Sequence, residues 1–127
     1  MTNQPGPKGQ LVIQIVAMPA DTNANGDIFG GWLVSHLDMG AGIAGRRRAQ
    51  SRVVTVAIDS LVFLKPVSVG DTVCCYADLV KVGRSSMQFK MEAWTLSLTE
   101  QHHQKAAEGL FTFVAIDANG KPQPVDR

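Results

Sequence analysis

The alternation of apolar and polar residues divides the first half of the chain into a strand, a loop and a helix. Residues 11–18 are rich in β-branched side chains and stop at Pro19, which predicts a strand. The following PADTNANGD segment is dense in turn formers and predicts a loop. An almost unbroken apolar run over about residues 28–48 predicts one long helix. Asp27 is the expected N-cap, and three arginines complement the C-terminal dipole.

Shorter apolar runs, separated by glycine and proline turns, make up the second half. Residues 52–64 and 72–82 predict two strands joined by a KPVSVGD turn. Apolar and polar residues alternate over residues 87–93, which indicates a half-buried strand, and residues 110–116 predict a last strand after a polar TEQHHQ loop. Short connections favour antiparallel neighbours. The elements therefore predict an α+β domain, with a curved antiparallel sheet of five or more strands around one central helix.

Composition restricts the possible functions only slightly. The length of 127 residues suits one domain, expected over residues 11–127 after a flexible polar segment at residues 1–10. Twelve Lys and Arg balance eleven Asp and Glu, so no nucleic-acid partner is expected. The chain shows no secretory signal and no apolar run long enough for membrane insertion, so we expect a cytoplasmic protein. The adjacent Cys74 and Cys75 suit neither a mutual disulfide nor a metal site.

One stripe of the predicted helix consists of very small residues around a single acid, Asp38. At 100° per residue the stripe contains Gly31, Ser35, Asp38, Gly42 and Gly45. Each helical glycine costs about 1 kcal/mol relative to alanine, which suggests close approach of another backbone or a ligand. Because only one long helix is predicted, the expected neighbour is the same helix in a second copy, giving a homodimer. The concave side of the sheet would be filled by Phe29, Trp32, Leu33, Leu37 and Ile43.

Several motifs together resemble a known family. DTNANGDIFGGWLVSHLDMG, followed by RVVTVAID, FLKPVSVGD and KVGRSS, is similar to the hotdog-fold acyl-CoA thioesterases, specifically the small bacterial YciA-type acyl-CoA thioester hydrolases. The similarity extends over about residues 10–122. It implies hydrolysis of acyl-CoA to a carboxylic acid and coenzyme A by dimers that often form trimers of dimers. It implies no metal and no cofactor, because coenzyme A is part of the substrate and product.

The resemblance also implies site residues. They are Asn23 in the loop before the helix, the N–H of Gly30 at the helix start, Asp38 further along, and the Thr55 hydroxyl on the next strand. An ordinary aspartate is ionised at neutral pH, so Asp38 could activate water or attack directly. The Gly30 N–H, at the positive end of the helix dipole, could hold the thioester oxygen. Gly31, the second glycine of the pair, is predicted to contact the substrate.

Helix geometry restricts how these residues cooperate. Gly30 and Asp38 are eight residues apart, about 12 Å along one helix, which is too far to act on one carbonyl. We therefore expect each site to take one of these residues from a second subunit, with two composite sites per dimer.

The KVGRSS segment combines cations with hydroxyl groups and suits the phosphates of coenzyme A, although a solvated hairpin is the alternative. The predicted contacts are Lys65, Arg84, Ser85 and Ser86. His102 and His103 have no matching cysteine or acid pattern, so no metal site is expected.

Two other functions remain open. The first is another thioester-processing hotdog enzyme, either an acyl-carrier-protein thioesterase or a dehydratase. A dehydratase would need a catalytic histidine paired with an acid, and the helix start has Phe29 where some relatives have histidine. The second is a non-catalytic acyl-CoA-binding regulatory module, which would need an output domain or a partner protein.

Overall fold

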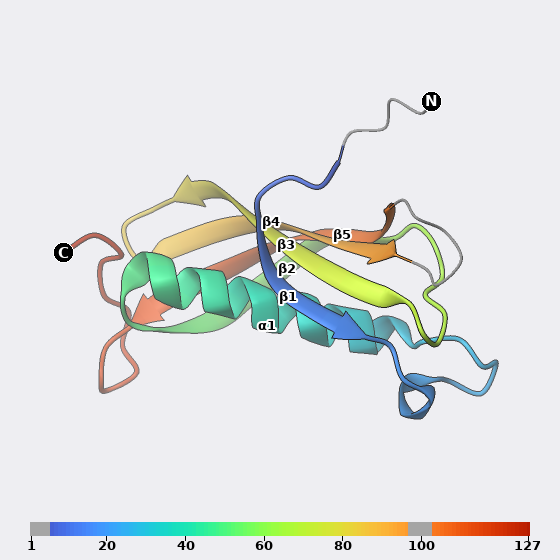
Figure 1. Ribbon diagram of the computed structural model, residues 1–127. Helices are drawn as coiled ribbons and strands as arrows, with labels where there is room; N and C mark the ends of the chain where they lie inside the picture. Colours follow the sequence, from blue (N-terminus) through green and yellow to red (C-terminus); the bar gives the residue numbers. More distant parts are fainter. Residues whose placement is uncertain (1–5, 97–102) are drawn as a thin grey trace.

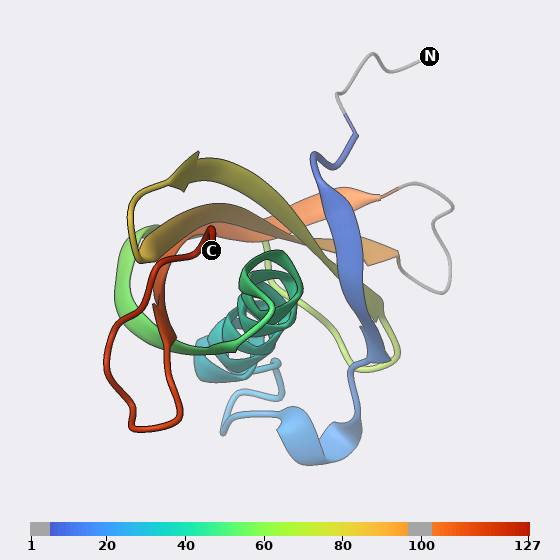
Figure 2. The ribbon, with the colours of Figure 1, turned by 90° about the vertical axis from the view of Figure 1, so that its left-hand side faces the viewer.

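A five-stranded antiparallel sheet curls around one long helix in the computed structural model, which describes residues 6–96 and 103–127 (Figure 1). The view along the helix shows the sheet wrapped about it on several sides (Figure 2). Part of the predicted N-terminal segment and most of the TEQHHQ loop lie outside the described residues. The elements are β1 (Gln10–Val16), the 3-10 turn η1 (Pro19–Asp21), α1 (Gly30–Ala49), β2 (Arg52–Phe63), β3 (Thr72–Val82), β4 (Ser86–Leu96) and β5 (Gln104–Ile116).

The strand order places the helix between the two edges of the sheet. The order is β1-β3-β4-β5-β2, and every neighbouring pair is antiparallel. The chain leaves β1 at one edge, crosses the concave face as α1, and enters β2 at the other edge. This arrangement confirms the predicted fold class, including the single central helix within the described part of the chain.

The core lies between α1 and the concave face. Leu33, Leu37 and Ala41 of the helix are buried there. The predicted alternation in β4 is confirmed, because the side chains on its helix-facing side are buried. The sheet side chains of this core include Val73, Cys75, Met87, Phe89, Met91, Phe111 and Phe113.

The helix begins later than its sequence pattern indicates. It starts at Gly30, and its N-cap is Phe29, without a side-chain cap. The expected cap at Asp27 is therefore wrong: the backbone N–H of Asp27 donates to Asn23 Oδ1 at 3.2 Å, so Asp27 belongs to the preceding loop. The C-terminal prediction is confirmed, since three arginines occupy the last turn and Gln50 closes it in the left-handed conformation.

The stripe of small residues does not face one neighbour. Gly45 is buried against the molecule's own sheet, where an added Cβ would lie 3.5 Å from the Val53 side chain. An added Cβ at Gly31 would have no other atom within 4 Å, so Gly31 faces open space. Phe29 was expected in the core but is 44% exposed. The glycines therefore serve two purposes: some allow close packing on the sheet, and others leave the outer face of α1 uncovered.

The outer edge of β2 is apolar and uncovered. Within the described residues β2 pairs only with β5, so its second edge has no strand partner. An exposed apolar edge strand favours association with another chain. Its exposed large apolar side chains are Val54, Val56, Ile58, Val62 and Phe63.

We expect Leu37→Ala to lower the free energy of unfolding by about 2–5 kcal/mol, because truncating this fully buried side chain leaves a cavity. Val80→Ala is the control, since Val80 is half-exposed and its loss should change the free energy by no more than about 0.5 kcal/mol. Urea unfolding at one fixed protein concentration measures both, because self-association would make unfolding concentration-dependent. Equal destabilisation by the two substitutions would contradict this description of the core.

Candidate functional site

Asp38 lies at the middle of α1, beside the start of β2. The Thr55 hydroxyl donates a 2.7 Å hydrogen bond to Asp38 Oδ1. The other carboxylate oxygen, Oδ2, has no hydrogen-bond partner among the described residues. Asp38 is half-buried, so one oxygen is held in place while the other remains available to a water molecule or a substrate.

The alternation of side chains along β2 places Thr55 on the side of the strand that faces the helix. Val53 packs against Gly45 of the helix, and Thr55, two residues further on, faces the helix as well. The β2–β5 register then shifts between Thr55 and Ala57. Such a bulge redirects the strand locally, and bulges are over-represented next to active sites.

Asn23 organises the loop that precedes α1. Its Oδ1 accepts hydrogen bonds from the backbone N–H of Asn25 at 2.9 Å and of Asp27 at 3.2 Å. Its backbone N–H donates to the Asp27 carbonyl at 2.7 Å. Because only the amide oxygen can accept these bonds, the orientation of the Asn23 side chain is defined. Its Nδ2 has no partner within the described part of the chain, so Asn23 offers donors to a ligand.

Gly30 combines a free donor with an aromatic neighbour. Its backbone N–H starts the helix and has no acceptor within residues 6–96 and 103–127. An added Cβ at Gly30 would lie 3.0 Å from the ring of Phe63, so the aromatic ring covers the side of Gly30 where a side chain would otherwise be. Phe63 is half-exposed and was missed by the sequence reasoning. The available signal was an aromatic side chain at the end of a strand, directly before the FLKP turn.

One chain therefore contains two separate half-sites. We call Asn23, Gly30 and Phe63 the helix-start half and the Asp38–Thr55 pair the mid-helix half. The eight residues from Gly30 to Asp38 separate the halves by about 12 Å along α1. Gly31 adds open space to the helix-start half.

The predicted coenzyme A contacts also fall into two groups. Lys65 follows β2 near the helix start, and its backbone N–H donates to the Ala106 carbonyl at 3.2 Å. Arg84 and Ser85 form the β3–β4 turn, and Ser86 begins β4. This turn lies at the C-terminal end of α1, whereas the end of β2, which Lys65 follows, lies at the other end of the molecule (Figure 1). A single chain does not bring Lys65 and Arg84 together.

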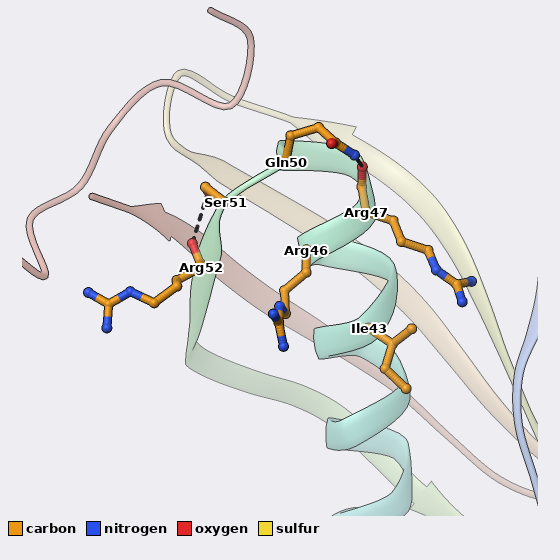
Figure 3. Close-up of a pocket in the computed structure, with 6 residues that line it drawn as sticks. All are labelled: Ile43, Arg46, Arg47, Gln50, Ser51 and Arg52. Carbon is orange, nitrogen blue, oxygen red and sulfur yellow. Dashed lines mark hydrogen bonds between the residues drawn. The ribbon is translucent and has the colours of Figure 1, made fainter. Parts of the chain in front are cut away.

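A cavity of about 570 Å³ lies at the C-terminal end of α1, away from both half-sites (Figure 3). None of the residues predicted for the site lines it. Its lining residues are Ile43, Arg46, Arg47, Gln50, Ser51 and Arg52.

Among the described residues, no three His, Cys, Asp or Glu side chains gather as a metal site would require. His103 lies edge-on to Trp94 with ring centroids 6.3 Å apart, and His102 lies outside the described residues. In the same part of the chain, no helix has the length and apolar character needed to cross a bilayer.

Comparison with known proteins places this chain among relatives that share its length and fold. A protein-family model described as "Thioesterase superfamily" matches residues 25–101. These residues contain the mid-helix half and most of the helix-start half. The acyl-CoA thioester hydrolase YciA of Salmonella typhimurium is 50% identical over 122 residues, covering 94% of this chain and 92% of that protein.

Two solved structures have the same architecture. A hexameric thioesterase from Yersinia pestis is 52% identical with a TM-score of 0.91, covering 95% of this chain and 98% of that chain. A hexameric broad-specificity acyl-coenzyme A thioesterase, solved as an aspartate-to-alanine mutant enzyme, is 49% identical with a TM-score of 0.91. The match covers 94% of this chain and 88% of that chain. With its sheet, helix and sequence all matching these relatives, the chain belongs to the thioesterase superfamily, within the hotdog-fold acyl-CoA thioester hydrolases.

Proposed function

We propose that this protein hydrolyses acyl-CoA to a free carboxylic acid and coenzyme A at sites shared between two subunits. The observation that carries the proposal is the Asp38 carboxylate, which Thr55 anchors through Oδ1 while Oδ2 has no partner within residues 6–96 and 103–127. A carboxylate held in this way suits an attack on a thioester, whose thiol leaves as a stable thiolate and needs little acid assistance.

Asp38 Oδ2 has two chemically balanced routes to the products. As a general base it takes a proton from water while the water oxygen bonds to the carbonyl carbon, the C–S bond breaks, and the proton passes to the departing thiolate. As a nucleophile it bonds to the carbonyl carbon and the C–S bond breaks, which releases the thiolate and leaves a mixed anhydride. Water then hydrolyses the anhydride to the carboxylic acid and the Asp38 carboxylate, and the proton that water releases goes to the thiolate. Neither route requires a metal or a cofactor. Thr55 is a positioning residue in both, because it fixes the carboxylate without touching the reacting atoms.

The helix-start half supplies the stabilisation of the oxyanion. The Gly30 N–H has no acceptor among the described residues and lies at the positive end of α1, where negative charge is favoured. Removing a single donor of this type typically costs about 100- to 1,000-fold in kcat. The Asn23 Nδ2 donors, which also have no partner in the part of the chain that the structure describes, orient the carbonyl oxygen or the water. Phe63 covers Gly30 from the side and limits the access of competing water.

The two halves act on one carbonyl only when they come from different chains. In an antiparallel dimer, Asp38 of one subunit faces Gly30 of the partner subunit, and the two-fold axis creates a second, identical site. The uncovered apolar edge of β2 and the exposed face of α1 provide the surface for this pairing. We propose homodimers assembled into trimers of dimers, as the hexameric relatives suggest.

Coenzyme A is substrate and product in this proposal. Gly31, Lys65, Arg84, Ser85 and Ser86 are its proposed contacts. Because Lys65 and Arg84 lie at opposite ends of one chain, they reach the same coenzyme A only from different subunits. We place the protein in the cytoplasm, since the buried, unpaired thiols of Cys74 and Cys75 suit a reducing compartment.

Asp38→Asn should lower kcat for acyl-CoA hydrolysis by at least about 100-fold, because it removes the base or nucleophile but keeps the shape of the side chain. Asp78→Asn is the matched control and should leave kcat unchanged, because this partly exposed position is on β3, which β4 and β5 separate from β2. Thiol release from acyl-CoAs of graded chain length measures both variants. Full turnover by Asp38→Asn would exclude this mechanism, and tight binding without turnover by the unmodified protein would favour a regulator.

Thr55→Val should lower kcat about tenfold or more with little change in KM, because a hydrogen bond to a charged group is lost. Thr55→Ser keeps the hydroxyl and should recover most of the rate. Steady-state kinetics with one acyl-CoA, together with urea unfolding, separates a positioning role from a loss of stability. A serine variant as impaired as the valine variant would argue against the hydrogen bond.

Mixing inactive Asp38→Asn and Asn23→Ala subunits should restore activity. In a one-to-one mixture half of the dimers contain both chains, and each of these has one intact site. About a quarter of the wild-type activity is therefore expected. Co-expression with two affinity tags isolates the mixed dimers, which should have about half of the wild-type activity because one of their two sites is intact. Each variant expressed alone is the control. Mixed dimers with no activity above the controls would show that one chain supplies the whole site.

A further inference from the structure

Of the three arginines in the last turn of α1, only one has a carboxylate partner among the described residues. Arg48 pairs with Asp126, Nη1 to Oδ1, at 2.7 Å. The side chains of Arg46 and Arg47 have no hydrogen bond or ion pair among the described residues. Interaction with the helix dipole accounts for cations at this end of the helix but leaves the guanidinium donors of Arg46 unsatisfied.

The cavity of Figure 3 adjoins this charge. The Arg46 side chain extends into the space between α1 and Arg52 of β2, whereas Arg47 points to the opposite side of the helix (Figure 3). None of the residues that line the cavity is acidic. Arg46 is therefore the one lining cation that both faces this space and lacks a partner within the described residues.

Arg46 lies on the uncovered face of α1 that begins at Gly31, next to the helix-start half. Gly31, Ser35, Met39, Gly42 and Arg46 follow one another at intervals of three or four residues, and none of them is buried. This uncovered face, which begins beside Gly30 and passes Asp38, therefore continues into the cavity.

The loop before α1 has the opposite charge. From Gly9 to Gly45 the sequence has no lysine or arginine, while Asp21 and Asp27 are in or next to the loop that Asn23 organises. Asp21 Oδ2 accepts the Met18 N–H at 3.0 Å. The Asp27 carboxylate is exposed and has no partner in the part of the chain that the structure describes.

The proposed shared site determines which segments meet. If Asp38 faces Gly30 of the partner subunit in an antiparallel pair, the two-fold axis passes level with Val34. Arg46 lies eight residues beyond Asp38, about 12 Å further along the axis. That position is level with the chain about 12 Å before the partner's Gly30. The loop of residues 21–27 extends past the start of α1 in this direction (Figure 1).

We propose that the cavity at the C-terminal end of α1 receives the residue 21–27 loop of the partner subunit, with Arg46 paired to Asp27 of the partner subunit. The proposal rests on the proposed function, because the shared site sets the register. Its consequence is that each subunit fixes the loop that carries the partner's Asn23. Arginine suits this contact, since its planar guanidinium binds carboxylates through two parallel hydrogen bonds.

Charge exchange tests the pairing without using activity. Arg46→Glu and Asp27→Arg should each raise the dissociation constant of the assembly about tenfold or more, as expected for a close interfacial charge pair. The double variant should return to within about threefold of wild type. Lys121→Glu, an exposed cation in the last turn of the chain, is the control and should have no effect. Sedimentation velocity over a dilution series at low salt measures all four variants.

Other outcomes overturn the proposal. A double variant no better than the sum of the single changes would exclude the pairing. If Arg46→Glu left assembly intact but raised KM for acyl-CoA, Arg46 would bind a substrate phosphate instead. If Asp38→Asn is inactive but charge exchange fails, the Arg46–Asp27 pairing is excluded while the shared active site is still supported. An active Asp38→Asn would remove the basis of the register itself.

Cross-linking gives a second test that does not depend on charge. A chain with both Arg46→Cys and Asp27→Cys should form covalent dimers with a short bis-maleimide. Either single variant should not, because two copies of position 46 lie about 36 Å apart along the axis in this register. The native thiols should not react: both are buried, and burial raises the pKa of Cys75 to about 12. Absence of covalent dimers from the double-cysteine protein would contradict the predicted contact.

Discussion

The antiparallel contact between α1 and β2 is the constraint on which the site depends. Three contacts define it: Gly45 with Val53, Asp38 with Thr55, and Gly30 with Phe63. The glycines at the two ends let the helix approach the strand closely. The Asp38–Thr55 hydrogen bond at the centre forms because the two elements are this close. The same contact therefore supports the fold, anchors the Asp38 carboxylate and gives Gly30 its aromatic neighbour.

The rigidity of a helix makes this contact incomplete as an active site. Because Gly30 and Asp38 are fixed about 12 Å apart, no rearrangement of side chains within one chain brings them to one carbonyl. In the proposed dimer, the uncovered β2 edge and outer face of α1 provide the surface on which a second chain completes the site. Association and catalysis then depend on the same surface, so substitutions on it are expected to alter both.

The sequence predicted β2 and β3 closely because β-branched runs between turns mark strands, whereas β5 begins at Gln104, six residues before the predicted start at residue 110. The bounds of β3 were predicted as observed, and β2 differs by one residue. The helix start was predicted two residues early, and Asp27 was assigned as its cap. Asn23 accounts for that error: its side-chain oxygen binds the Asp27 N–H and keeps the loop out of the helix. This local competition follows from the three-dimensional arrangement of the loop, which residue preferences do not describe.

By itself the sequence determined the order of elements, the α+β class and the small-residue stripe around Asp38, because periodicity and turn chemistry are local properties. Its motifs also identified the family. The tertiary structure alone decided that Gly45 faces the sheet while Gly31 faces outward, that Phe63 covers Gly30, and that Lys65 and Arg84 lie at opposite ends. These facts depend on how α1 crosses a curved sheet, and that crossing results from packing between residues far apart in the chain.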